Sequence, residues 1–142
     1  MSRIQLRLRD ALQNKDKRIG FHLSTFDIPR DATAEIDKSA GLVTFSFRYV
    51  DDEQAGPSQK LSDDISIDVG KNSGKLLALR INCKRYPAGQ VEVRFHKALT
   101  EIDQAFKQTA KNLKAHQREN YELVRSVIDE NRPDVENALA KA

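Results

Sequence analysis

The sequence predicts an α+β fold in which an antiparallel β-meander of about five or six strands packs against a long C-terminal helix. Two apolar patterns lead to this prediction. Between residues 19 and 96, apolar residues tend to alternate with polar ones, as in strands with one buried face. From residue 98 onwards they recur every three or four positions, and neither glycine nor proline interrupts residues 90–132. The 142 residues suffice for a single domain, residues 1–142, with a sizeable core.

The N-terminal segment, residues 1–18, fits two kinds of secondary structure. Ile4, Leu6 and Leu8 alternate with polar residues as in a strand, but Ile4 and Leu8 also belong to a helical stripe. Ser2 and Gln5 resemble a capping box, and residues 3–13 include only one β-branched side chain. We therefore expect a helix in this segment.

The central segment, residues 19–96, predicts the antiparallel sheet. Its clearest strand is residues 42–49, where Val43, Phe45 and Phe47 face one way. Residues 51–58 read as a polar, mobile loop. Further strands are expected at residues 19–28, 33–36, 65–69, 76–83 and 91–95.

A weak internal repeat within this region predicts two hairpins. Ile36-Asp37 is followed by Gly41 before one strand, and Ile67-Asp68 is followed by Gly74 before another. Asp accepts hydrogen bonds from backbone N–H groups in turns, and Gly tolerates a positive φ. Two hairpins in series give an antiparallel meander.

The C-terminal segment predicts a long amphipathic helix over residues 98–131, ended by Pro133, and a short terminal helix over residues 134–141. Such a helix would be about 50 Å long at 1.5 Å per residue. A compact domain of this size is only about 30–35 Å across. One end of the helix should therefore extend beyond the sheet and expose its apolar stripe.

The exposed apolar stripe could be buried in two ways, by a second chain or by a bend that folds the helix back as a hairpin. The polar stretch over residues 114–120 holds no turn residue stronger than Asn120, so we expect pairing. The prediction is a homodimer whose interface uses the stripe residues Leu113, Tyr121, Val124 and Ile128.

Charge is distributed unevenly along the chain. Residues 21–70 hold four basic and ten acidic side chains, whereas residues 71–97 hold seven basic and one acidic. The basic residues are expected on a hairpin over residues 80–97, where they would suit phosphate groups of a nucleic acid. They could equally pair with acidic groups or shield a sheet edge. This basic patch comprises Arg80, Lys84, Arg85, Arg94 and Lys97.

Catalytic and metal-binding patterns are not found in the sequence. Cys83 is the only cysteine, so an intramolecular disulfide is impossible. His22, His96 and His116 lie far apart and lack metal-ligand spacing. We predict no catalytic residue, no metal and no cofactor. An enzyme ranks third among the functions considered, and a pocket uniting His22, Cys83 or His96 would raise it.

The N-terminal residues are charged where a signal peptide needs an apolar run, and no stretch approaches a membrane span of about 18 apolar residues. These observations predict a cytoplasmic protein with no membrane partner. The leading hypothesis is a non-enzymatic binding or assembly protein that dimerises through its C-terminal helix and has a protein partner. The alternative is a nucleic-acid-binding protein that uses the basic patch.

Overall fold

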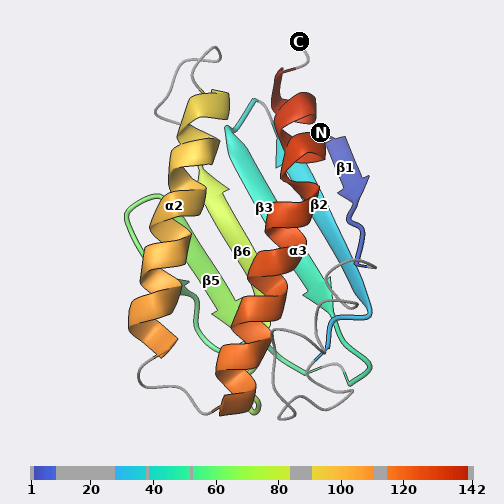
Figure 1. The fold of residues 1–142 in the computed structure, drawn as a ribbon, viewed down its shortest axis with the longest axis vertical. Helices are drawn as coiled ribbons and strands as arrows, with labels where there is room; N and C mark the ends of the chain where they lie inside the picture. Colours follow the sequence, from blue (N-terminus) through green and yellow to red (C-terminus); the bar gives the residue numbers. More distant parts are fainter. Residues whose placement is uncertain are drawn as a thin grey trace.

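The computed structural model describes residues 2–8, 28–37, 39–51, 53–83, 91–110 and 115–140 (Figure 1). Over these residues, a six-stranded antiparallel sheet packs against two helices, which confirms the predicted α+β class. The elements are β1 (Ser2–Gln5), β2 (Asp31–Asp37), β3 (Leu42–Arg48), β4 (Gln59–Lys60), β5 (Ile65–Val69), β6 (Leu76–Asn82), α2 (Val91–Ala110) and α3 (Ala115–Ala140).

The strand order is β1-β2-β3-β6-β5-β4, two three-stranded meanders joined where β3 pairs with β6. The β2–β3 and β5–β6 pairs are the two hairpins that the internal repeat predicts. Gly41 and Gly74 adopt φ values of 65° and 74°, which side chains other than glycine rarely tolerate. The chain therefore uses the same turn chemistry twice.

The two turns are nevertheless held by different carboxylates. In the first, Asp37 accepts hydrogen bonds from the Ser39 hydroxyl and the Ala40 N–H. In the second, Glu53 accepts from the N–H groups of Asn72 and Ser73, at 3.2 and 3.1 Å. Glu53 belongs to residues 51–58, which the sequence presents as a mobile loop. Its anchored carboxylate corrects that view for this position.

A β-bulge changes which residues of β6 point inward. The register shifts between Asp68 and Val69, so that Val69 pairs with Leu76 whereas Asp68 pairs with Ala78. Leu76 is fully buried while Leu77 is only partly buried. Regular alternation with Leu79 and Ile81 over the strand predicted at residues 76–83 would place Leu77 on the inner face, and the bulge is the physical reason for the difference.

The start of the chain is a strand rather than the predicted helix. β1 pairs with β2, with Ile4 opposite Ala34. The alternation of Ile4 and Leu6 prevails over helix propensity because β2 offers a free edge to pair with. Beyond β1, the backbone of Arg7 pairs with the side-chain amide of Asn131 in α3. The segment over residues 9–27 lies outside the described residues.

Residues 91–95 are the start of α2, not a strand. The residue that decides this is Val93, which is 67% exposed although a strand would have turned it inward. Phe95 instead begins a buried helical stripe that continues through Leu99, Ile102 and Phe106. Its ring stacks on Phe45 of β3, with centroids 6.2 Å apart. Three alternating apolar residues, Val91, Val93 and Phe95, are too few to distinguish the two-residue period of a strand from the 3.6-residue period of a helix.

The predicted long helix is two helices that fold back on each other, the alternative that the sequence left open. The rings of Phe106 and Tyr121 lie 5.1 Å apart, and Arg125 Nε is 2.9 Å from Asp103 Oδ1. In one continuous helix, residues 106 and 121 would lie about 22 Å apart. The chain reverses between α2 and α3, and residues 111–114 lie outside the described residues.

Pro133 does not end the helix as predicted but lies inside α3. Proline removes a backbone donor and crowds the preceding turn, which disfavours a helix interior. Val135 and Leu139 are buried beyond it, so packing against the sheet keeps the helix continuous. The predicted separate helix over residues 134–141 is therefore the end of α3.

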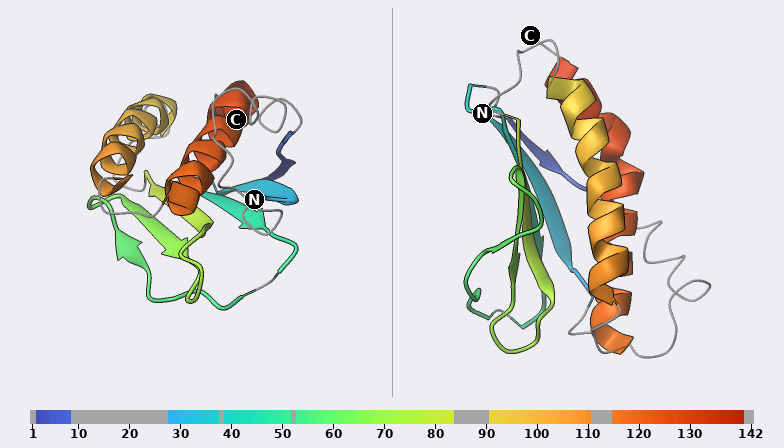
Figure 2. Two further views of the ribbon diagram at one scale, coloured as in Figure 1. Left: turned by 60° about the horizontal axis from the view of Figure 1, so that its bottom comes forward. Right: turned by 90° about the vertical axis from the view of Figure 1, so that its left-hand side faces the viewer.

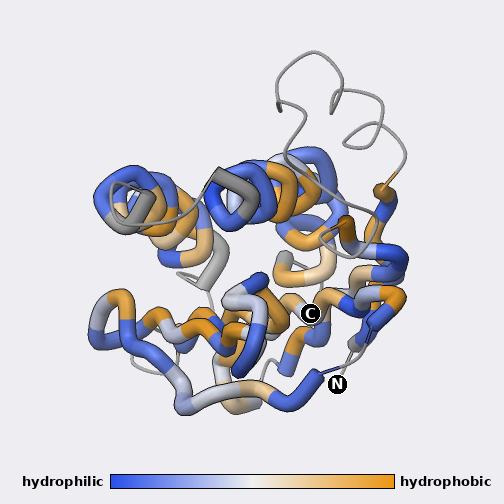
Figure 3. Tube along the Cα trace, turned by 90° about the horizontal axis from the view of Figure 1, so that it is seen from below, coloured by the Kyte–Doolittle hydropathy of each residue, from blue (hydrophilic) through white to orange (hydrophobic). Residues whose placement is uncertain are grey.

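Both helices cover the same face of the sheet, and the hydrophobic residues gather between the two layers (Figures 2 and 3). Tyr121, Val124 and Ile128 are part of this core, at most 6% exposed. They were predicted to form a dimer interface because the helix was expected to overhang. The fold of α3 against its own sheet removes that reason.

An acidic substitution at Val124 distinguishes a role of the helical stripe in the core from its predicted role in a dimer interface. Val124→Asp should lower the free energy of unfolding by more than about 4 kcal/mol, because an unpaired charge would be buried. Urea unfolding followed by circular dichroism measures this loss, with the exposed Arg118→Asp on α3 as the matched control. A folded Val124→Asp protein of half the wild-type mass would contradict the packing described here.

Candidate functional site

The face of the sheet opposite the helices is the broadest candidate site (Figure 2). Because side chains alternate along each strand, the residues between the buried ones point to this face. We call it the open face. Its outward residues include Arg3, Gln5, Asp31, Thr33, Glu35, Thr44, Ser46, Arg48, Lys60, Ser66, Asp68 and Arg80.

Opposite charges are already paired within the open face. Arg3 lies 3.3 Å from Glu35, and Arg80 lies 2.6 Å from Asp68. The hydrogen bond from Arg80 holds the pKa of Asp68 below its usual value, although partial burial opposes this, and the Ser58 hydroxyl adds to the lowering. Arg48 and Lys60 make no ion pair with any residue that the structure describes.

The aromatic side chains of the strands do not reach this face. Phe45 and Phe47 of β3 point into the core against the helices. No outward position on the six described strands is aromatic. Sheets that bind single-stranded nucleic acid stack bases on outward aromatic rings. The described part of the open face offers hydroxyls and charges instead.

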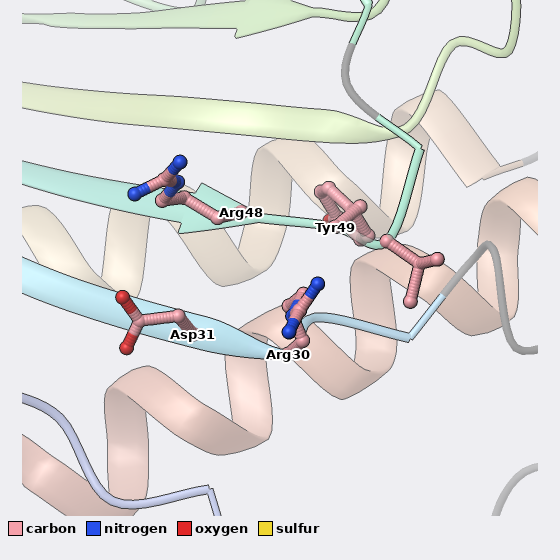
Figure 4. A pocket seen from close by; sticks show the side chains of 5 residues that line it. Arg30, Asp31, Arg48 and Tyr49 are labelled. Carbon is pink, nitrogen blue, oxygen red and sulfur yellow. The ribbon is translucent and has the colours of Figure 1, made fainter.

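A cavity of about 440 Å³ lies at the end of β2 and β3 (Figure 4). Its lining residues are Arg30, Asp31, Arg48, Tyr49 and Val50, and we call it the arginine pocket. Asp31 and Arg48 are partners across the two strands. Gln5 of β1 donates a hydrogen bond to Asp31. This volume lies within the usual range of ligand pockets.

The backbone of the arginine pocket is fixed by buried contacts. The Tyr49 hydroxyl donates to the carbonyl of Leu76 at 2.7 Å and accepts from the side-chain amide of Asn120 at 3.0 Å. Lys75 packs over the Tyr49 ring at 4.7 Å. Since Tyr49 points into the core, its two neighbours in the chain, Arg48 and Val50, are held in position on the outer side.

The predicted basic patch is not assembled on a hairpin. Arg80 is on β6 and pairs with Asp68, while Arg94 is on α2 and contacts Asp64 and Glu101, each at 2.9 Å. The Arg94 side chain is only 7% exposed. Lys97 is exposed on α2, and Lys84 and Arg85 lie outside the described residues. Two of the five cations are thus used inside the fold.

The remaining candidate residues do not form a catalytic or metal site in the described part of the chain. Cys83 is buried, and burial raises the pKa of its thiol although Arg94 opposes this. His96 is exposed on α2, 3.8 Å from Glu136. Leu113 and His22 lie outside the described residues. Among those described, no three His, Cys, Asp or Glu side chains could together hold a metal ion.

Sequence reasoning missed the arginine pocket. Arg30 and Val50 stood among residues taken for strand ends and a loop, and Arg48 was noted only as an outward position. The available signal was Pro29-Arg30 before one strand and Arg48 at the end of the next. Because hairpin strands run antiparallel, the start of β2 must lie beside the end of β3.

Comparisons with protein-family models, with curated proteins and with solved structures found no significant match for this chain. No helix in the described ranges is long and apolar enough to cross a membrane.

The Asp68–Arg80 pair predicts a pH-dependent contribution to stability. Because the pKa of Asp68 is lowered in the folded state, its stabilisation is present above the unfolded value near 3.8 and is lost as the pH falls through the folded value. Asp68→Asn should cost about 1–2 kcal/mol at pH 7, and the difference from wild type should shrink as the pH falls below the unfolded value near 3.8.

Urea unfolding at a series of pH values measures this difference. Asp63→Asn, which alters an exposed carboxyl near the start of β5, is the control and should have little effect. A cost of Asp68→Asn that is the same at every pH would contradict the electrostatic origin.

Proposed function

We propose that this protein is a non-enzymatic binding protein whose open face meets a protein partner. The observation that carries the proposal is the one-sided cover of the sheet: both helices lie on one face, and the other presents outward side chains from all six strands. Its polar groups are spread in rows and partly paired with one another. Such a surface suits recognition of another surface better than chemistry at one point.

The charges of the open face favour a partner that is acidic at the points of contact. After the internal pairs Arg3–Glu35 and Arg80–Asp68 are set aside, Arg48 and Lys60 remain without a described ion pair. Arg48 lies on β3 and Lys60 on β4, with β6 and β5 and their paired side chains Arg80 and Asp68 between them. A protein surface with acidic side chains at two points would complement this arrangement.

A second copy of the chain is one protein partner that the proposal covers. The helical stripe is taken up by the core, so a homodimer would have to form through another surface. The open face is the broadest surface available for it among the described residues. Light scattering of the full chain distinguishes a self-associating protein from one that needs a different partner.

A bulky anion at the centre of the open face tests the proposal. Ser46→Glu, on the central strand β3, should repel an acidic partner and reduce its retention at least about tenfold. The matched control is Gln104→Glu, which adds the same side chain to the exposed surface of α2. Immobilised wild-type and variant proteins are compared for the proteins they retain from lysate and for their mass in solution.

The expected result is that a specific partner, or a dimer mass, is present for wild type and Gln104→Glu and lost for Ser46→Glu. Unfolding curves of all three proteins check that the variants remain folded. Equal retention by the three proteins, or no partner and a monomeric mass for all of them, would reject the open face as the binding surface.

The alternative function is nucleic-acid binding, favoured by the basic sequence pI of about 9.0. The affinity of a protein for phosphates falls as salt is added. On duplex DNA the slope of log affinity against log salt concentration is about −0.9 per phosphate contact. Because Arg80 and Arg94 are paired and Lys97 lies on the helical side, we expect weak binding whose salt slope is smaller in magnitude than about 3. Fluorescence anisotropy with duplex and single-stranded probes at several salt concentrations measures it, and a steep slope would favour the alternative.

A further inference from the structure

Two arginine side chains line the arginine pocket without an ion pair to any described residue. Arg30 and Arg48 are both exposed and contact no acidic side chain within the described residues closely enough to pair. Other arginines of the described sheet and of α2, such as Arg80 and Arg94, have carboxylate partners. The arginine pocket therefore presents donors whose counterion is not supplied by the described chain (Figure 4).

The charges of the lining residues indicate how many negative charges a ligand should bring. Arg30 and Arg48 contribute two positive charges, and Asp31 contributes one negative charge. Asp31 also accepts a hydrogen bond from Gln5, which holds it at the β1 side. The sum is one positive charge, which a monoanion neutralises, whereas a phosphate dianion would leave one negative charge in excess. A carboxylate is a monoanion that a guanidinium fork binds through two parallel hydrogen bonds.

One lining residue favours an apolar group next to the carboxylate. Val50 is 50% exposed and, with Val93, one of two large hydrophobic side chains exposed in the described part of the chain. It projects from the same short segment as Arg48 and borders the cavity. An aliphatic group of a ligand placed there would remove apolar surface of Val50 from water.

We propose that the arginine pocket binds a carboxylate that carries an aliphatic group. The carboxylate lies between Arg30 and Arg48, and the aliphatic group lies against Val50. The carboxylate belongs either to a free organic acid or to an acidic residue beside an aliphatic one on a peptide. The arginine pocket is defined by its own side chains, so the proposal does not depend on the open face having a protein partner.

The backbone around the arginine pocket is held before any ligand arrives. The N–H of Arg30 donates to the carbonyl of Arg48 at 2.8 Å, and the preceding Pro29 is buried. The Tyr49 hydroxyl is fixed by Leu76 and Asn120 in the core. Since the two arginines and Val50 project from fixed backbone, only side-chain rotamers must be ordered on binding, which lowers the entropic cost.

Isovalerate is the first probe, because it combines one carboxylate with a branched aliphatic group. Its binding to the full chain is followed by NMR through the Val50 methyl signals and the arginine Nε–H signals. We expect saturable shifts with a dissociation constant on the order of 1 mM, usual for so small a ligand. Isovaleramide, which lacks the charge, and acetate, which lacks the aliphatic group, should bind at least about fivefold more weakly.

Substitutions in the arginine pocket locate the site. Arg30→Gln and Arg48→Gln should each weaken isovalerate binding about tenfold or more, and Val50→Ser should remove the preference for isovalerate over acetate. Arg118→Gln, which alters an exposed arginine on α3 that does not line the arginine pocket, is the matched control. Should a glutamine variant not fold, Arg→Lys at the same position keeps the charge but loses the fork and should weaken binding less.

A pair of capped peptides, Leu-Glu-Leu and Leu-Gln-Leu, distinguishes the two sources of the carboxylate. Binding of the glutamate peptide tighter than isovalerate assigns the carboxylate to a partner chain, and weaker binding assigns it to a free acid. The proposal is overturned if neither carboxylate causes saturable shifts, or if the shifts persist in both arginine variants. Tighter binding of inorganic phosphate than of isovalerate would also overturn it. The isovalerate titration uses the protein with Ser46 in place and measures the arginine pocket directly, so its result does not depend on the partner assay of Ser46→Glu.

Discussion

The apolar face of the sheet is the constraint on which the rest of the structure depends. Six strands spaced about 4.8 Å apart make a surface about 24 Å wide, whereas one helix is about 10 Å across with its side chains. A single helix would leave half of this surface in water. The chain therefore needs two helices, and the helical segment must reverse direction after α2. The core residues Phe95 and Val124, from the two helices, lie on the same apolar face.

Buried amides join the helical layer to the sheet where backbone groups would otherwise lack partners. Asn120 accepts a hydrogen bond from the N–H of Leu76 beside the β-bulge. The side chain of Asn131 accepts a hydrogen bond from the N–H of Arg7 and donates one to its carbonyl, as the backbone of a neighbouring strand would do. Both asparagines are at most 1% exposed. Such satisfied polar contacts fix the position of α3 along the sheet more specifically than apolar packing does.

Both described helices lie on one face of the sheet, so the inward residues of the strands hold the fold together. Outward residues such as Thr44 and Ser46 contribute little to the core. The arginine pocket shows how the inward and outward residues are connected. Tyr49 points inward into the buried hydrogen-bond network, and Arg48 and Val50 on either side of it face the pocket. The core thereby orders a surface site.

The sequence by itself determined the elements whose patterns are long and local. Alternation over residues 42–49 indicated β3 and its buried face, and the repeated Asp and Gly pattern indicated both hairpins. The spacing of apolar residues beyond residue 98 indicated helix. These features could be predicted because strand alternation, turn chemistry and helical periodicity act between residues close in the chain.

Only the tertiary structure decided the features that depend on contacts between distant segments. β1 is a strand because β2 accepts it, and Pro133 stays within α3 because Val135 and Leu139 pack beyond it. Arg94 is not part of an exposed basic patch, because its side chain pairs in the fold with Asp64, thirty residues away in the chain. The arginine pocket likewise arises from Arg30 and Arg48, which the strand register brings together. Pairing across such separations depends on which surfaces the whole chain must bury, and no local pattern encodes that.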